Sequence, residues 1–466
     1  MSDKSFIKDI EKMDFTLPET KVIVLGVIEM LCDTVVELRQ EVQELKNEVA
    51  RLKGEKGKPN IKPNIKPSSK PKMEKGTPKQ WKKTGKVIKV DREELVKIDK
   101  TLLPKDAVFK GYEDTIIQGV IFESNNVCYK REVFYSASEK KTYIAPMDSS
   151  LEGTSFSPEL KAQILRFYFE CRMPENKIHS LLTSIGISIS EGQISNIIIK
   201  EQADKFSEEK EEIFNAGMDT AVTSNIDDSG FRENGINKYI NIICNAFFSI
   251  FIVNDNKKSK TVEEMFAGKD ISKIAFASDD AKQFITVFNI LQLCWVHEER
   301  HYQKLNPIMD MHREELDFII SEIWNFYREL KEYKKTPNEL YKKILEEIFD
   351  SIFNREVHYP ALNKRLKLTY AKKDRLLTVL THPSVDVHNN RSENGIREGV
   401  VKRKVSGGTR VHDGTTAWEN HFSIMATCKK QGVSYYEYIL TIFKRENHKK
   451  SLADLIREKA TATAIA

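Results

Sequence analysis

The sequence predicts a multidomain α/β protein, and three observations support this fold class. The chain has 466 residues, and because a domain has about 150 residues, this length predicts roughly three units. Short apolar runs that favour buried strands precede a long stretch with helical periodicity. The N-terminal region differs from both, because it carries an unbroken heptad pattern. We therefore expect an N-terminal coiled coil, a body built on a sheet, and an all-helical part.

Composition excludes several classes of protein. Apolar residues make up 40% and charged residues 31% of the chain, which is typical of a globular protein. No apolar run approaches the ~18 residues that a membrane span needs, and the start, Met-Ser-Asp-Lys, lacks the pattern of a signal peptide. The six cysteines are far apart, which argues against zinc knuckles and a disulfide framework. We expect a cytoplasmic protein with reduced thiols and no membrane contact.

An apolar stripe with spacings of three and four residues predicts a long helix. Its members are Val24, Ile28, Leu31, Val35, Leu38, Val42, Leu45, Val49 and Leu52. β-Branched residues at one core position and leucines mostly at the other favour a parallel two-stranded coiled coil. The alternative is a single amphipathic helix that packs on its own domain. The length of the stripe favours a homodimer or larger assembly formed through this helix.

The basic residues are concentrated in one segment after this helix. Residues 51–90 contain fourteen lysines and arginines against Glu55 and Glu74, a net charge of +12, although the whole chain carries only +5. Repeated Lys-Pro steps disfavour helix and sheet and predict an extended linker. Such a segment is either a solvated tail or a contact for DNA phosphates. On the second interpretation, Lys82 and Lys83 are candidate DNA contacts.

A small β module and a helical region are expected next. Apolar residues and turn-forming residues alternate between 105 and 147, which favours short strands. Ser157-Pro158-Glu159 predicts the start of a helix, a second helix ends at Gly186, and a third begins near Ser190.

The last two of these helices resemble a helix-turn-helix, although any helical hairpin gives this pattern. In a helix-turn-helix, the final helix would present Gln193, Ser195 and Asn196 to DNA.

Candidate metal ligands follow two predicted strands. The predicted strands are 222–227, 239–244, 246–253 and 274–278. The first ends at Asp227-Asp228 and the last at Asp279-Asp280, and carboxylates in such places suit hard divalent cations. A third acid, Glu393, lies in a Gly- and Asn-rich stretch at 388–414, which interrupts the helical pattern expected from 308 onwards. A single acid at a strand end is more often a cap, so their order and context carry the argument.

Five sequence motifs, in this order, resemble the DDE transposases of the insertion sequence sixty-six family. They are Asp227-Asp228-Ser229-Gly230-Phe231-Arg232, Ser278-Asp279, Cys294-Trp295-Val296-His297, Asn389-Asn390 with Glu393 and Arg397, and Ala426-Thr427-Cys428-Lys429-Lys430-Gln431-Gly432. The leading coiled coil and the Lys/Pro-rich linker also match the plan of this family.

The resemblance implies a ribonuclease-H-like core in which Asp227, Asp279 and Glu393 are the catalytic acids. These acids would hold two Mg²⁺ ions, with Mn²⁺ able to substitute, for the cleavage and joining of double-stranded DNA at element ends and target. Candidate phosphate contacts are Arg397, Lys402 and Arg403. A transposase of this kind would act in a prokaryotic cytoplasm, in association with the nucleoid.

The predicted domains follow from these patterns and from the resemblance. They are the coiled-coil helix at 1–54, the basic linker at 55–100, the small β module at 101–150, the helix-turn-helix-like region at 151–215, the first core part at 216–305, the helical insertion at 306–380, and the second core part with C-terminal helices at 381–466.

Four departures from the family pattern support an alternative function. Phe231 replaces a tryptophan, Asp280 a glycine and Asn394 an arginine, and the N-terminal Cys-rich segment of many relatives is absent. The alternative is a non-catalytic or domesticated DNA-binding regulator that retains the fold. A purely structural dimerisation protein is a third interpretation, which the basic segment disfavours.

Overall fold

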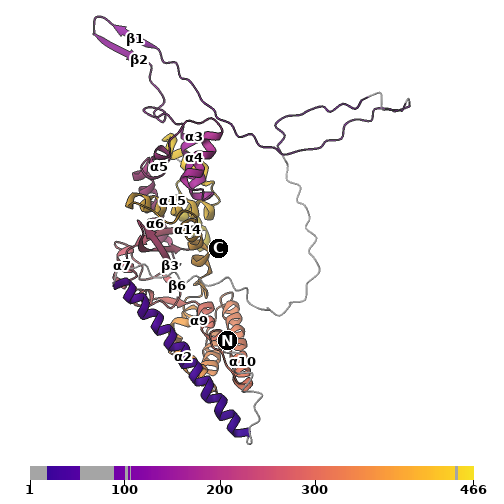
Figure 1. Ribbon diagram of the computed structural model, residues 1–466, viewed down its shortest axis with the longest axis vertical. Helices are drawn as coiled ribbons and strands as arrows, with labels where there is room; N and C mark the ends of the chain where they lie inside the picture. The colour runs from indigo at the N-terminus through magenta and orange to yellow at the C-terminus, as the bar shows by residue number, and fades with distance from the viewer. Residues whose placement is uncertain (1–17, 53–88, 100–102, 105, 447–449, 466) are drawn as a thin grey trace. The chain divides into compact units, whose positions relative to one another are not determined.

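The computed structural model describes residues 18–52, 89–99, 103–104, 106–446 and 450–465. Contacts divide the chain into two compact units, Met1–Arg39 with Asn126–Ala466, and Gln40–Asn125. Lys82, Lys83 and almost all of the predicted basic segment lie outside the described residues. The larger unit contains the sheet and its surrounding helices (Figure 1).

The elements before the sheet are mostly helical. They are α2 (Pro18–Leu52), the hairpin of β1 (Val133–Ser136) and β2 (Lys141–Ile144), α3 (Pro158–Leu165) with a π-helical extension (Arg166–Glu170), α4 (Glu175–Ser184), α5 (Glu191–Ile199) and α6 (Ala203–Thr220). The predicted starts of α3 and α5 are confirmed, because the hydroxyls of Ser157 and Ser190 accept hydrogen bonds from the backbone N–H groups of Leu160 and Gln193. The predicted strands between 105 and 147 are limited to β1 and β2 among the described residues of that stretch.

A five-stranded mixed sheet forms the centre of the larger unit. Its strands are β3 (Thr223–Glu233), β4 (Ile236–Cys244), β5 (Ser249–Asn254), β6 (Ala275–Ser278) and β7 (Leu291–Leu293), in the order β5-β4-β3-β6-β7. The strands β3, β4 and β5 are antiparallel, whereas β6 is parallel to β3 and β7 is parallel to β6. Four of these strands fulfil the sequence prediction, but β7 has only three residues and was not expected.

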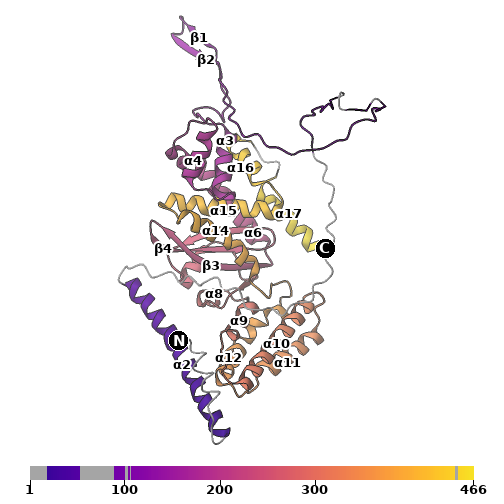
Figure 2. The same cartoon turned by 45° about the vertical axis from the view of Figure 1, so that its right-hand side comes forward.

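Helices connect and cover the sheet. They are α7 (Ser259–Met265), α8 (Lys282–Val287), α9 (Trp295–Tyr302), α10 (Asp310–Tyr333), α11 (Glu339–Phe353), α12 (Pro360–Tyr370), α13 (Lys373–Leu376), a 3₁₀ turn (Thr378–Leu380), α14 (Asn390–Ser406), α15 (His412–Gln431), α16 (Tyr435–Lys444) and α17 (Leu452–Ile465). Figure 2 shows α14 and α15 on one side of β3 and the bundle of α10, α11 and α12 on the other. One continuous apolar core joins α3 to α6, the sheet and this bundle.

Two expectations about local structure were wrong. The Gly- and Asn-rich stretch 388–414 is mostly helical, because residues 390–406 form α14; only residues 407–411 interrupt the helices, between α14 and α15. Asp227 does not end its strand either, because β3 continues to Glu233 while pairing with β4. In both cases contacts with the sheet override the local preference of glycine and aspartate for turns.

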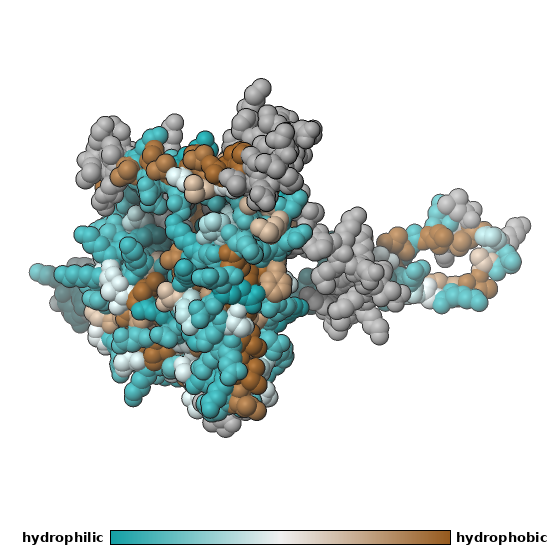
Figure 3. Space-filling model, turned by 90° about the horizontal axis from the view of Figure 1, so that it is seen from below, coloured by the Kyte–Doolittle hydropathy of each residue, from teal (hydrophilic) through white to brown (hydrophobic). Residues whose placement is uncertain are grey.

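The helix α2 exposes an apolar row, which Figure 3 shows on the surface seen from below. Its exposed members include Leu31, Val35, Leu38, Val42 and Leu45, whose exposed fractions range from 43% to 65%. These residues belong to the predicted heptad. No helix in the described part of the chain has both the length and the apolar character required to cross a bilayer.

Candidate active site

The register of two parallel strands brings the first two acids to the same level of the sheet. Asn225 of β3 pairs with Ala277 of β6. Asp227 lies two residues after Asn225, and Asp279 lies two residues after Ala277. Strand β6 ends at Ser278, so Asp279 directly follows it. Because β6 ends here while β3 continues, the edge leaves space beside Asp227.

The third acid comes from α14, which lies against β3 and β4. Gly395 and Gly399 allow this close approach, because a Cβ atom at these positions would lie 2.4 Å and 3.3 Å from the Cδ1 atoms of Ile242 and Ile240. Glu393 and Asp227 line the same cleft, together with Ile396, Arg397 and Val400.

Buried Asn389 fixes the start of α14 to β3. Its Nδ2 donates to the carbonyl of Ile226 at 3.0 Å, and its Oδ1 accepts from the Ser392 hydroxyl at 2.6 Å and from Asn225 Nδ2 at 3.4 Å. Its backbone carbonyl accepts a hydrogen bond from the N–H of Glu393. The residue before the first acid is therefore connected to the third acid through one residue, by the side chain of Asn389 on one side and its backbone carbonyl on the other.

Two of the three acids, Asp227 and Asp279, lack the lysine partners that the adjacent acids Asp228 and Asp280 have. Asp228 pairs with Lys257, and Asp280 pairs with Lys372 at 2.8 Å. Among the described residues, Asp227 and Asp279 have no lysine or arginine partner; each accepts a backbone N–H, from Asp228 at 2.8 Å and from Ala281 at 3.2 Å.

The protonation of the acids reflects this environment. Burial, followed by the charge of Asp279, raises the pKa of Asp227 to about 7, and the carboxylate of Glu393 contributes. Burial also raises the pKa of Asp279. In contrast, a hydrogen bond from His301 and the charge of Lys372 hold the pKa of Asp280 well below its usual value.

The carboxylates of Asp227, Asp279 and Glu393 are candidate ligands for a divalent cation, because they offer hard oxygen atoms. In the described part of the chain, however, these three are not among the groups whose ligand atoms all lie within 4.8 Å of one another. Glu393 Oε1 is buried without a hydrogen-bond partner among the described residues. A bound cation would relieve the repulsion that raises the pKa of Asp227, because the positive charge favours the ionised carboxylates.

The helix α9 adds basic side chains that the sequence analysis did not assign to the site. His297 Nδ1 lies 3.6 Å from Glu393 Oε1, and Arg300 Nη2 lies 3.9 Å from Glu393 Oε2. Their spacing of three residues places both on one helical face, which is the signal that could have identified Arg300. Cys294 Sγ, a ring nitrogen of His297 and a carboxylate oxygen of Glu393 lie within 4.8 Å of one another.

The three predicted phosphate contacts differ in position. Arg397 is exposed at the cleft of Asp227 and Glu393. Arg403 is half-buried, and its Nη1 would lie 3.2 Å from a Cβ atom added at Gly230.

Lys402 is completely buried, donates to the carbonyl of Met173 at 3.0 Å and lies 3.4 Å from the centre of the Tyr168 ring. Burial lowers its pKa to about 7. We therefore no longer expect Lys402 to contact phosphate.

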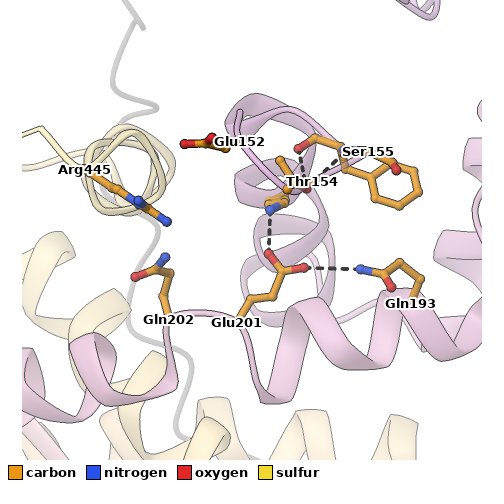
Figure 4. A pocket seen from close by; sticks show the side chains of 10 residues that line it. Glu152, Thr154, Ser155, Gln193, Glu201, Gln202 and Arg445 are labelled. Carbon is orange, nitrogen blue, oxygen red and sulfur yellow. Dashed lines mark hydrogen bonds and ion pairs between the residues drawn. The ribbon is translucent and has the colours of Figure 1, made fainter. Parts of the chain in front are cut away.

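The three residues expected to recognise DNA do not share one exposed surface. Asn196 is exposed, but Gln193 points into a pocket of about 370 Å³ and donates to Glu201 Oε1 at 3.2 Å (Figure 4). Glu201 also pairs with Lys161 at 2.7 Å. Ser195 is half-buried and hydrogen-bonds to Glu175. Only Asn196 is thus fully available to a groove of DNA.

Comparison with known proteins identifies the family. The profile described as "Transposase IS66 family" matches residues 153–417. A relative, "Uncharacterized protein y4jO" of Sinorhizobium fredii, is 39% identical over 162 residues, which are 35% of this chain and 50% of the relative. The chain thus spans about half the length of that relative. The profile covers more than half of the chain, including all three acids, and the protein therefore belongs to the IS66 family of transposases.

Proposed function

We propose that this protein cleaves phosphodiester bonds at the ends of a mobile element and joins the freed ends to target DNA, in a reaction that depends on Mg²⁺. The observation that carries this proposal is the placement of Asp227 on β3, Asp279 directly after the adjacent strand β6, and Glu393 on α14. Among the described residues, the first two acids have no lysine or arginine partner. The strand order supports a ribonuclease-H-like core, as three antiparallel strands are followed by two strands parallel to the first.

The roles of the residues follow from their positions. Asp227, Asp279 and Glu393 would hold the cations, for which Mn²⁺ could also serve. When bound, two such ions would supply activation of the attacking hydroxyl and stabilisation of the leaving oxygen. Asn389 would keep Glu393 beside Asp227, and positioning of this kind accounts for much of the rate of phosphoryl transfer.

DNA would enter the cleft from its exposed side. Arg397 lies at the rim of the cleft and can neutralise a phosphate. Arg300, beside Glu393, is nearly half exposed and is a second candidate for this role. Asn196 remains a candidate base contact on α5. Phosphate contacts of this kind predict binding that weakens steeply with salt.

The exposed heptad row of α2 supports a homodimer or larger assembly. The row from Leu31 to Leu45 exposes large apolar side chains in water, and pairing with the same row of a second copy would bury them. Two cores in one assembly would allow two element ends to be processed together.

Cleavage of end-labelled DNA that carries the element ends tests this function. Asp227→Ala, Asp279→Ala and Glu393→Ala should each abolish nicking and joining in Mg²⁺ while leaving DNA binding in place. Glu398→Gln is the matched control, because Glu398 is on the same helix as Glu393 but pairs with Arg172. Cleavage that persists in all three alanine variants would refute the proposal.

The same experiment separates the alternative, a DNA-binding regulator without catalysis. The departure at Asn394, which is exposed beside Glu393, favours this alternative. It predicts salt-sensitive binding to the element ends with no cleavage in Mg²⁺ or Mn²⁺. Metal-dependent strand breaks at defined positions would exclude it.

A further inference from the structure

The first half of α2 makes a second set of contacts, on a face other than the exposed heptad row. Leu25 and Ile308 form a small buried apolar cluster, against which Ile28, Cys32 and Met309 pack. Residues 25, 28 and 32 lie on one helical face. This cluster is separate from the main core and joins α2 to the start of α10.

A buried carboxylate at the centre of this contact binds the backbone just before α10. The residue before α10 is Met309, whose side chain makes no capping hydrogen bond. Glu29 of α2, only 2% exposed, holds the two residues that precede the helix, because its Oε1 accepts from the N–H of Ile308 at 2.5 Å and from that of Met309 at 3.4 Å. Its Oε2 lies 2.5 Å from His312 Nδ1. A carboxylate is favoured at the N-terminus of a helix, where backbone N–H groups lack partners.

Further polar contacts extend along α12. The Tyr359 ring stacks on His312, and its hydroxyl donates to Asp33 at 3.3 Å. Lys364 donates to Glu37 at 2.7 Å on the surface. The contact therefore combines apolar packing with a buried charged group whose partners are all supplied by the helical insertion.

We propose that the helical insertion is the docking site for the N-terminal helix of its own chain. Glu29 determines the register of the contact, because an uncompensated charge at this buried position would be costly. The exposed row from Leu31 to Leu45 remains available, so α2 can dock on the insertion by one face and pair with a second copy by the other. The two faces meet at Ile28.

The docking also reaches the neighbourhood of the active site. Arg365, next to Lys364 on α12, pairs with buried Glu298 of α9, and Lys372 connects Glu298 at 3.1 Å to Asp280 at 2.8 Å. Asp280 directly follows Asp279. One helix of the insertion therefore contacts α2 on one side and the helix that carries His297 on the other.

Cross-linking within the full chain tests the docking without reference to catalysis. Glu37→Cys with Lys364→Cys replaces an exposed ion pair, in a background of Cys128→Ser and Cys171→Ser that removes the exposed thiols among the described residues. A short bismaleimide should then produce a fast-migrating monomer on a denaturing gel. The two single-cysteine variants show whether Cys32 reacts instead.

Three further variants test the role of Glu29 and the independence of docking from dimerisation. Glu29→Lys should slow the cross-linking about tenfold or more, which is at least ~1.4 kcal/mol, whereas Glu44→Lys, an equal change at an exposed position of α2, should not. Leu38→Asp should abolish dimers in light scattering and leave the cross-link intact. Far-UV circular dichroism of Glu29→Lys shows that the core remains folded. Absence of the cross-link, a cross-link between chains, or one that Glu29→Lys does not slow would overturn the proposal.

Discussion

Replacement of Asn389 by alanine tests whether one buried side chain holds the candidate catalytic acids together. The side chain makes three hydrogen bonds, to Ile226, Ser392 and Asn225. Since each such bond contributes about 1 kcal/mol net, we expect Asn389→Ala to lower the free energy of unfolding by about 3 kcal/mol.

The functional effect should exceed what the loss of stability explains. Without these bonds, the start of α14 can shift relative to β3, and a displacement of about 1 Å can reduce a rate about 10²-fold. We therefore expect cleavage of element-end DNA at saturating Mg²⁺ to fall by about that factor, at a temperature where the variant remains folded.

Urea denaturation followed by tryptophan fluorescence measures the first effect, and the cleavage assay measures the second. Asn394→Ala is the matched control, because Asn394 is exposed on the same helix. Its free energy of unfolding should stay within about 0.5 kcal/mol of the wild type. If Asn389→Ala behaves like this control in both assays, the assignment of Asn389 as a positioning residue is wrong.

Three other predictions concern protonation, charge and backbone conformation. His421 is buried, and burial lowers its pKa from 6.5 to about 3, so the unfolded chain takes up this proton first as the pH falls. The resulting loss of stability, on the order of 3 kcal/mol between pH 8 and pH 4.5, should disappear in His421→Gln. An unchanged pH dependence of urea unfolding in this variant would contradict the prediction. Lys402→Met should leave the salt dependence of DNA binding unchanged, whereas Arg397→Ala should reduce the slope of log affinity against log salt concentration by about 1 in filter binding. The reverse result would show that Lys402 contacts phosphate. Gly408→Ala should lower the free energy of unfolding by about 2 kcal/mol or more, because φ is +103° and a Cβ atom would lie 2.3 Å from the Arg232 carbonyl oxygen. Gly407→Ala is the control, because φ is +77° there but nothing lies within 4 Å of an added Cβ atom, and thermal denaturation should show a smaller loss of stability for it.

Much of the local structure follows from the sequence alone. Ser157 and Ser190 cap helices where the sequence predicts them, since a hydroxyl before a helix satisfies N–H groups only two or three residues away. Strand β6 and the second half of β4 lie close to their predicted positions because most of their residues are buried and apolar. The order of the three acids and the family were also evident from local motifs.

Other features depended on contacts between distant residues. Gly395 and Gly399 favour a loop by composition, but they lie in a helix because only glycine allows α14 to approach β4 so closely. Lys402 has the composition of a surface charge, yet it is buried beside Tyr168. No local pattern shows that Glu29 binds the backbone just before a helix that begins at residue 310.

The two pairs of adjacent acids show most clearly what the sequence determines and what the tertiary structure decides. Residue type and spacing do not distinguish Asp227 from Asp228 or Asp279 from Asp280, and the first of each pair was chosen from the family resemblance. The tertiary structure distinguishes them, because Lys257 and Lys372 neutralise Asp228 and Asp280 and leave the other two acids without such a partner among the described residues. The sequence determined which residue types were present and in what order, since capping and strand preference act over a few residues. The fold decided which charges remain unpaired, because burial and ion pairing depend on side chains that are distant in the sequence.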